Sequence, residues 1–313
     1  MQSRIVLTSV FLFLFVASPV CISSFALARE DGIAVLFPDI GEPYRGVFEQ
    51  ILAGIEEKAG GRVSNIPVRA NTDAGDLAGE LRRQNIRVVI ALGKHGVRTS
   101  AGLDGKIDVV AGAVLSVGEA EARDNTVITL APDPALLFGR LKALAPDTRR
   151  VTVIYSPQNN EWLMRLARIA AKNQGFELNA LPADDMKTAL RLYQEFLAGG
   201  THTDALWLPQ DIVTVEESTI VPLVLRETWN REIPLFSSSL AHVRRGALFS
   251  LYPDNQELGR ALASTALAYF GGTRPAKGLQ PLRGVLAAVN TRTASHLGIS
   301  LNQQRFDILL PDR

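Results

Sequence analysis

The order of strands and helices occurs twice along the chain, and this repeat limits the fold more than any other feature. Residues 32–116 are predicted to form four strands separated by three helices, and residues 151–239 repeat that order. Several predicted strands, such as "RVVIALG" (87–93), are apolar at consecutive positions, which is typical of parallel strands that helices cover on both faces. We therefore predict an α/β fold with two doubly wound parallel-sheet lobes.

Local signals predict the strands and several helix ends. Gly175 is expected to end a helix in the left-handed conformation. Asp254, followed three residues later by Glu257, is expected to cap the start of another helix. Short runs rich in Val, Ile and Leu predict the strands. These are 32–38, 62–68, 87–93 and 108–116 in the first half, 151–155, 176–182, 205–209 and 233–239 in the second half, and 247–252 and 285–291 after it.

Polar and aromatic side chains follow the strand ends of both halves. In doubly wound sheets, ligands bind outside the carboxyl ends of the strands, so two lobes that face each other would bring these side chains to one cleft. The candidate ligand-binding residues are Asp39, Glu42, Tyr44, Lys94, His95 and Ser116 in the first half, and Ser156, Gln158, Asn159, Gln210, Asp211 and Ser238 in the second half.

Several of these residues also have a purely structural alternative. Asp211 could hold an ammonium or hydroxyl group of a ligand, or cap the helix that is predicted to begin at the next residue. Asn159 could likewise contact the ligand or cap a helix. Tyr44 and Trp162 could stack on a ligand, but both also belong to apolar helical stripes that would pack in the core. Lys94 could bind a carboxylate or remain a solvated surface residue.

Residues 1–28 are typical of a secretory signal peptide. Arg4 precedes the uncharged apolar segment 5–20, and small residues follow where a signal peptidase cleaves. We expect cleavage after Ala28 and export to the periplasm. The alternative is a permanent membrane anchor, which Pro19 disfavours because it interrupts the apolar segment. The mature chain would contain no cysteine and equal numbers of basic and acidic residues, so nucleic acid is not expected as a partner.

The sequence lacks the motifs of common catalytic and metal sites. It contains no phosphate-binding glycine loop and no G-x-S-x-G nucleophile turn. Its four histidines are scattered, without the spacing of a local metal-binding pair. Ser238, His242 and Asp211 could in principle form a hydrolytic triad, but His242 could equally lie on an exposed loop. We therefore predict that the protein is not an enzyme and has no catalytic residue, cofactor or metal ion.

Five segments carry a resemblance to a known family. They are "YSPQNNE" (155–161), "LWLPQD" (206–211), "IPLFSSS" (233–239), "GALFSLYPDNQELGR" (246–260) and "VNTRTASHLGI" (289–299). Taken together and in this order, they resemble the substrate-binding proteins of ABC transporters. More narrowly, they resemble the type I periplasmic binding-protein family that includes tryptophan- and tyrosine-binding members. The resemblance covers essentially the whole mature chain.

The resemblance implies two lobes joined by a hinge with three crossovers. The first lobe would comprise 29–118 and about 251–278, and the second 119–250 and about 279–313. It also implies a monomer that closes around a small organic solute and delivers it to an ABC permease with a separate ATPase. The alternative is a sensory module that docks on a membrane receptor or signalling protein.

The corners of the first half differ from those of the family, which bears on the ligand. "GKHG" (93–96) stands where many relatives have a threonine- or serine-proline pair, and "AVLSVGE" (113–119) replaces another of their turns. The resemblance therefore does not carry an aromatic amino acid over to this chain. The mixed set of acids, bases, amides and hydroxyls suits an amino-acid-like or amphipathic ligand, and a lipid-like one is compatible with it.

Overall fold

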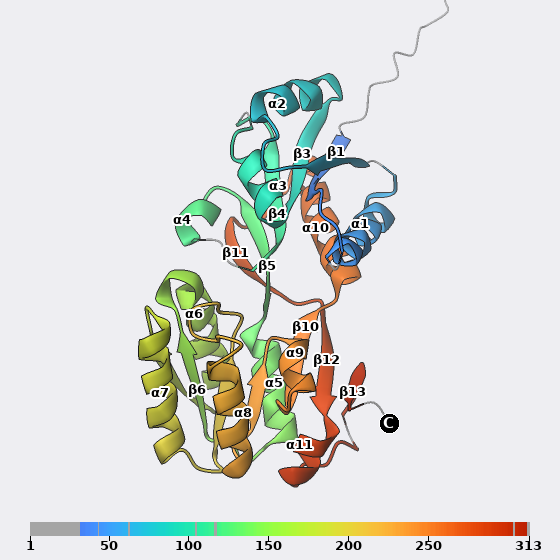
Figure 1. Ribbon diagram of the computed structural model, residues 1–313. Helices are drawn as coiled ribbons and strands as arrows, with labels where there is room; N and C mark the ends of the chain where they lie inside the picture. Colours follow the sequence, from blue (N-terminus) through green and yellow to red (C-terminus); the bar gives the residue numbers. More distant parts are fainter. Residues whose placement is uncertain are drawn as a thin grey trace, which may run out of the picture. The chain divides into compact units, whose positions relative to one another are not determined.

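The computed structural model describes residues 32–42, 44–61, 63–103, 105–115, 118–302 and 304–311. These residues form two sheets with helices packed against them (Figure 1). The predicted signal peptide, 1–28, lies outside the described residues. Among those residues, no helix is long and apolar enough to cross a membrane.

The first sheet has six strands, and every pairing in it is parallel. We call this sheet and the helices α1 to α4 and α10 the first lobe. In sheet order, the strands are β11 (Gly278–Leu282), β5 (Thr126–Pro132), β4 (Asp108–Val114), β3 (Ile86–Leu92), β1 (Gly32–Pro38) and β2 (Val63–Val68). The helices are α1 (Arg45–Ala59), α2 (Ala74–Arg83), α3 (Gly93–Ser100), α4 (Glu119–Ala122) and α10 (Asn255–Phe270).

The second sheet has seven strands, which are parallel except where β12 pairs with β10. This sheet and the remaining helices are called the second lobe. In order, the strands are β13 (Ile308–Leu310), β12 (Val285–Asn290), β10 (Phe249–Pro253), β9 (Leu235–Ser237), β8 (Asp204–Leu208), β6 (Arg150–Tyr155) and β7 (Glu177–Pro182). The helices are α5 (Pro134–Leu144), α6 (Pro157–Gln174), α7 (Met186–Gly199), α8 (Ile220–Asn230), α9 (Leu240–Arg244) and α11 (Thr291–His296).

The predicted α/β class with two doubly wound sheets is confirmed, and the chain passes between the sheets three times. Two of these crossings come later in the chain than expected from the sequence. The family resemblance implies a first crossing near residue 118 and a last one near 278, and no strand is predicted at 126–132 or 278–282. The structure pairs β5 with β11 in the first sheet, so these crossings follow Pro132 and Leu282.

Helix α10 returns to the first lobe and packs against α1, although about 200 residues separate them in sequence (Figure 1). Glycines let the two backbones approach closely. A methyl group on Gly54 would overlap the carbonyl of Gln256, and one on Gly259 would overlap the carbonyl of Ile51. Asp254 caps α10 by accepting a hydrogen bond from the backbone nitrogen of Glu257 at 3.0 Å, as predicted.

The core of the second lobe is rich in aromatic rings. Trp207 is fully buried and stacks on Phe236 with ring centroids 6.3 Å apart, and Phe138 meets both edge-on. Trp162 also packs into this core, so its structural alternative is the one observed. Tyr44 differs, because 64% of it is exposed, and the expectation that it packs in the core is wrong.

Candidate functional site

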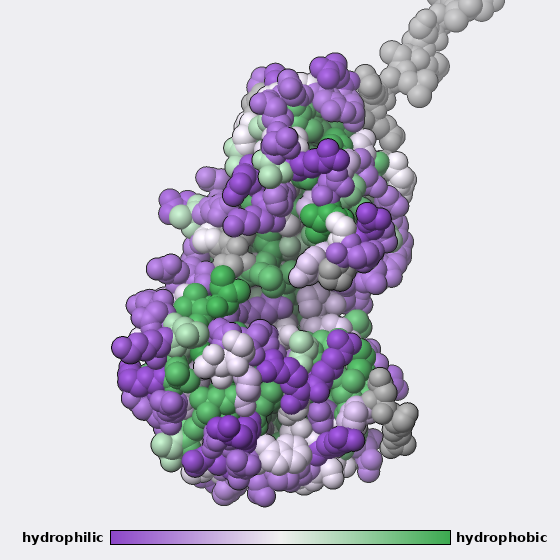
Figure 2. Space-filling model, in the orientation of Figure 1, coloured by the Kyte–Doolittle hydropathy of each residue, from purple (hydrophilic) through white to green (hydrophobic). Residues whose placement is uncertain are grey.

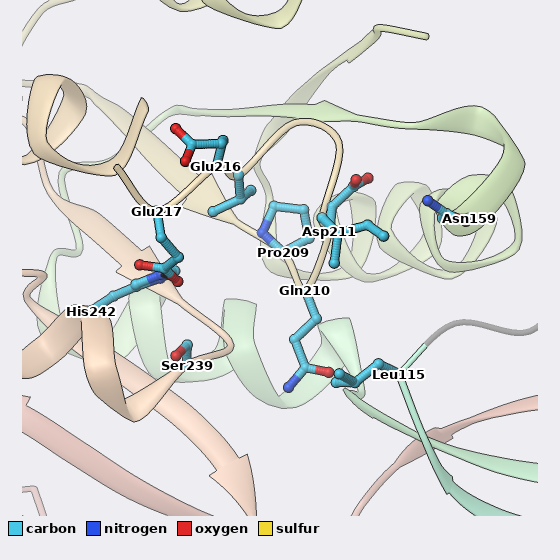
Figure 3. Close-up of a pocket in the computed structure, with 11 residues that line it drawn as sticks. Leu115, Asn159, Pro209, Gln210, Asp211, Glu216, Glu217, Ser239 and His242 are labelled. Atoms are coloured by element: carbon cyan, nitrogen blue, oxygen red, sulfur yellow. Dashed lines mark hydrogen bonds and ion pairs between the residues drawn. The ribbon is translucent and has the colours of Figure 1, made fainter. Parts of the chain in front are cut away.

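A pocket with a volume of about 420 Å³ lies at the carboxyl end of the second sheet (Figure 3). Most of its wall is the segment that follows β8. One lining residue, Leu115, comes from the first lobe, directly after β4. The lining residues are Leu115, Asn159, Pro209, Gln210, Asp211, Ile212, Val215, Glu216, Glu217, Ser239 and His242.

Asp211 is buried and fixes two corners of the second lobe to each other. One carboxylate oxygen accepts hydrogen bonds from the backbone nitrogens of Val213 (2.9 Å) and Thr214 (3.2 Å). The other accepts from the backbone nitrogen of Ser156 (2.6 Å) and from the Asn160 side chain (2.9 Å). Because Ser156 is the N-cap of α6, the start of that helix is tied to the segment after β8.

The segment after Asp211 is a turn, which corrects the prediction that a helix begins at Ile212. Helix α8 starts only at Ile220. Residues 212–215 are all β-branched and therefore poor helix formers. The Thr214 hydroxyl instead donates to the carbonyl oxygen of Ile154, at 3.0 Å, and holds the turn against β6.

Glu216 satisfies the backbone groups that precede α8. Its carboxylate accepts hydrogen bonds from the backbone nitrogens of Ser218 (2.9 Å) and Thr219 (2.6 Å) and from the Ser218 hydroxyl. These bonds stabilise the charged form, above all those from Ser218, and lower the pKa of Glu216 to about 2. The carboxylate thus acts as the cap of the turn that begins α8.

His242, on α9, is also buried and connects three elements. Its Nδ1 lies 2.6 Å from the hydroxyl of Ser237, and its Nε2 lies 2.9 Å from a carboxylate oxygen of Glu217. The other oxygen of Glu217 accepts from the Arg245 guanidinium at 2.7 Å. Ser237 is completely buried and does not line the pocket, and its hydroxyl already bonds to His242 and accepts from the backbone nitrogen of Ser239. The serine, histidine and glutamate therefore form a hydrogen-bond network that joins β9, α9 and the turn. The alternative that His242 lies on an exposed loop is wrong, because it lies on α9 and is buried.

The side-chain amide of Gln210 has a hydrogen-bond partner for its nitrogen but none for its oxygen among the described residues. Its nitrogen donates to the carbonyl oxygen of Ser238 at 3.1 Å, which fixes the orientation of the amide. Its Oε1 is buried and has no hydrogen-bond partner within the part of the chain that the structure describes. In Figure 3 the side chain extends toward Leu115. An unpartnered acceptor thus lies in the pocket wall.

The pocket also presents apolar side chains to solvent. Ile212 is 80% exposed and Leu115 is 57% exposed, although most of the face drawn in Figure 2 is hydrophilic. Leu115 follows an irregular strand end, because the register of β4 against β5 shifts between Gly112 and Val114. Between these two, Ala113 has a φ of 56°, in the left-handed region.

A second cavity, of about 380 Å³, lies in the first lobe between α1 and the ends of β1 and β2. Its polar lining residue Asp39 accepts hydrogen bonds from the guanidinium of Arg69, at 2.7 Å from Nε and 2.6 Å from Nη2. Both side chains are exposed, so this pair is solvated. The cavity is lined by Phe37, Pro38, Asp39, Ile40, Arg45, Phe48, Glu49, Leu52 and Pro67.

The predicted site residues separate into three groups. Asn159, Gln210 and Asp211 line the first pocket, whereas Ser156 and Ser238 are buried behind it and bond to Asp211 and Gln210. Asp39 lines the second cavity. The remaining described ones line neither cavity, and they are Glu42, Tyr44, Lys94, His95 and Gln158. Ser116 lies outside the described residues.

Sequence reasoning missed much of the wall that follows Asp211, namely Ile212, Val215, Glu216 and Glu217. The four consecutive β-branched residues were the available signal, because they argue against the helix that would have carried these side chains elsewhere. Nothing in the sequence indicated the contact between Glu217 and His242, which joins positions far apart in the chain.

Comparison with known proteins identifies the family. Residues 72–306 match the family model described as ABC transporter substrate binding protein, and the chain belongs to that family. No curated protein matches the chain. The protein is accordingly a substrate-binding protein of the kind that serves ABC transporters and binds small ligands, and it has the type I periplasmic binding-protein fold.

Solved structures agree on the fold. A ligand-free, open substrate-binding protein with adhesive properties from Clostridium difficile has a TM-score of 0.62 and 16% identity, covering 90% of this chain and 100% of its own. A domain from Streptococcus pneumonia in complex with L-Trp has a TM-score of 0.54 and 16% identity, with coverage of 90% and 100%. A conserved domain protein from Vibrio cholerae has a TM-score of 0.52 and 18% identity, with coverage of 89% and 99%.

Proposed function

We propose that the protein captures a small organic solute in the pocket after β8 and delivers it to an ABC permease that works with a separate ATPase. The observation that carries this proposal is that one pocket is lined by Leu115 of the first lobe and by residues of the second lobe. A ligand there would touch both lobes and favour the conformation in which they close on it. The L-Trp complex of a structurally similar domain supports an organic ligand of this size.

The proposed capture is not catalytic and takes place in the periplasm. The buried hydroxyl of Ser237 supports the first part, since it lies outside the pocket lining and its bond to His242 joins β9 to α9. The predicted signal peptide at 1–28 supports the second, and proteins of this family are generally exported. We propose a monomer, because closure of two lobes within one chain requires no second copy.

Thermal unfolding of the mature protein against a library of amino acids, nucleosides, sugars, peptides and lipids tests capture. A ligand that binds only the folded state raises the Tm by an amount set by its concentration relative to Kd. Ile212→Arg should abolish the shift, because it places a charge on the pocket rim. Ile169→Arg is the matched control, since Ile169 is also exposed but lies on α6 outside the pocket. A library without any stabilising compound, or equal shifts in both variants, would contradict capture at this site.

Delivery needs its own measurement. Uptake of the identified ligand should fall in cells that lack this protein and recover when the wild-type chain is returned. Ile169→Arg should restore uptake, and Ile212→Arg should not. Uptake that is unchanged by the deletion would contradict delivery while leaving capture intact, and would favour the sensory role instead.

A further inference from the structure

Three carboxylates line the pocket, and each of them already accepts hydrogen bonds from other groups of the protein. Asp211 uses both oxygens to accept four hydrogen bonds, one of them from the backbone nitrogen of Ser156, the N-cap residue of α6. The amino end of an 18-residue helix carries a partial positive charge that compensates a carboxylate at this position. A ligand cation would therefore have to displace hydrogen bonds that hold the corner together.

The two glutamates are engaged in the same way. Glu216 is bound by the backbone and hydroxyl donors that precede α8, at the amino end of that helix. Glu217 forms an ion pair with Arg245 and a hydrogen bond with His242. A ligand ammonium would therefore meet only carboxylates that already have hydrogen-bond donors within the protein, and among the lining residues there is no lysine or arginine to pair with a ligand carboxylate.

Besides the carboxylates and the polar residues Asn159, Ser239 and His242, the lining consists of apolar surfaces and one amide acceptor. Leu115, Pro209, Ile212 and Val215 supply the apolar walls. The Oε1 atom of Gln210 supplies the acceptor, since it is buried and has no partner among the described residues. A buried acceptor without a partner is unfavourable, so a donor that reaches it gains both the new hydrogen bond and the removal of that cost.

We propose that the part of the ligand bound in this pocket is uncharged, with an apolar body held between Leu115 and Ile212 and one N–H or O–H group that donates to Gln210 Oε1. This inference rests on the proposed capture of a solute at the same site. It selects against the free zwitterion of an amino acid, because both of its charges would lose their hydration without gaining a partner in the wall.

Ligands that share one apolar body and differ only in their end group test the charge. One set contains tryptophol (uncharged), tryptamine (cation), indole-3-propionate (anion) and tryptophan (zwitterion), and parallel sets carry a phenyl or a branched alkyl body. In whichever set binds, we expect the uncharged alcohol to bind at least tenfold more tightly than its charged counterparts. Tighter binding of a charged member would overturn the inference while confirming capture. If no member of any set binds while a compound of the wider library still raises the Tm, the inference is overturned and capture stands; if that library also gives no shift, capture itself is contradicted.

The hydrogen bond can be tested from the ligand side and from the protein side. Replacing the hydroxyl of the bound alcohol by its methyl ether should weaken binding to the wild-type protein about tenfold. Gln210→Leu should weaken binding of the alcohol to a similar extent but leave the ether unchanged. Gln158→Leu is the matched control and should change neither, because Gln158 is exposed and lines no cavity. If the ether binds the wild-type protein as tightly as the alcohol, the donor to Gln210 is wrong, and this result does not depend on whether the leucine variant folds.

Discussion

Both lobes contain the same arrangement, a strand followed by a corner and a helix (β1 and α1, β6 and α6), but they hold that helix in different ways. In the second lobe, α6 is fixed at its start, where Ser156 is buried and its backbone nitrogen donates to Asp211. In the first lobe, α1 begins at an exposed Tyr44 with no side-chain cap. That helix is instead fixed at its middle, where Gly54 meets α10.

This difference shows which lobe holds its pocket wall in place without a ligand. The polar groups behind the second-lobe pocket are bonded to one another, so its wall is defined by the fold itself. The corner after β1 has exposed polar residues and one solvated ion pair, between Asp39 and Arg69. A preformed wall reduces the ordering cost of binding, which supports placing specificity in the second lobe.

The largest effect is expected where α1 touches α10. Gly54→Ala would force a methyl group into the carbonyl of Gln256 and should lower the free energy of unfolding by about 3 kcal/mol. Gly46→Ala is the matched control in the same helix, since no atom lies within 4 Å of the added methyl. It should raise stability by about 0.5–1 kcal/mol. Urea unfolding of the two variants measures both values. Equal effects would show that close helix contact does not fix α1.

The next effect compares an aspartate from each lobe. Asp211→Ala removes four hydrogen bonds and leaves buried donors without acceptors, so we expect a loss of about 3 kcal/mol in the free energy of unfolding. Asp39→Ala removes only an exposed ion pair with Arg69 and should cost less than about 1 kcal/mol. A cost for Asp39→Ala as large as that for Asp211→Ala would contradict the contrast between the two corners.

These two aspartates also show what the sequence can and cannot predict. Both follow apolar strands, and this position alone suggested a ligand-binding role for both. Only the structure reveals that one carboxylate oxygen of Asp211 accepts hydrogen bonds from Ser156 and Asn160, because those partners come from another corner of the lobe. Most strands of the two sheets could be predicted, because a strand that is buried on both faces appears in the sequence as a continuous apolar run.

The strands that the sequence missed lack that signal. β11 is an edge strand, contains Pro281 and has no fully apolar run. β5 reads "TVITLAP", in which Thr126 and Thr129 are buried because their hydroxyls donate to carbonyl oxygens near β11. A polar residue that is buried through a distant partner looks exposed in sequence, so the sequence offered no strand at β5 to correct the crossing that the resemblance implied.

A smaller effect concerns pH and the start of α8. The folded-state pKa of Glu216 is about 2, below its ordinary value of 4.5. Its stabilising contribution is therefore complete above about pH 4.5 and disappears as the pH falls toward 2. The stability difference between wild type and Glu216→Gln should be constant near neutral pH and shrink across this acidic range. A difference that is independent of pH would mean that the charge of Glu216 does not hold the turn.

The smallest effect distinguishes the strand end that carries Leu115 from the regular part of the same strand. Ala113 has a φ of 56°, which costs a residue with a side chain about 1 kcal/mol. Ala113→Gly removes this cost but adds about 0.5–1 kcal/mol of backbone freedom in the unfolded chain, so stability should change by less than about 0.5 kcal/mol. Ala111→Gly, within β4, gains no such relief and should cost about 1 kcal/mol.

Because a glycine at 113 also permits other conformations, it should weaken ligand binding more than Ala111→Gly does, despite the smaller loss of stability. If binding instead follows stability in the two variants, the irregular strand end does not position Leu115, and the contribution of the first lobe to the pocket must come from elsewhere.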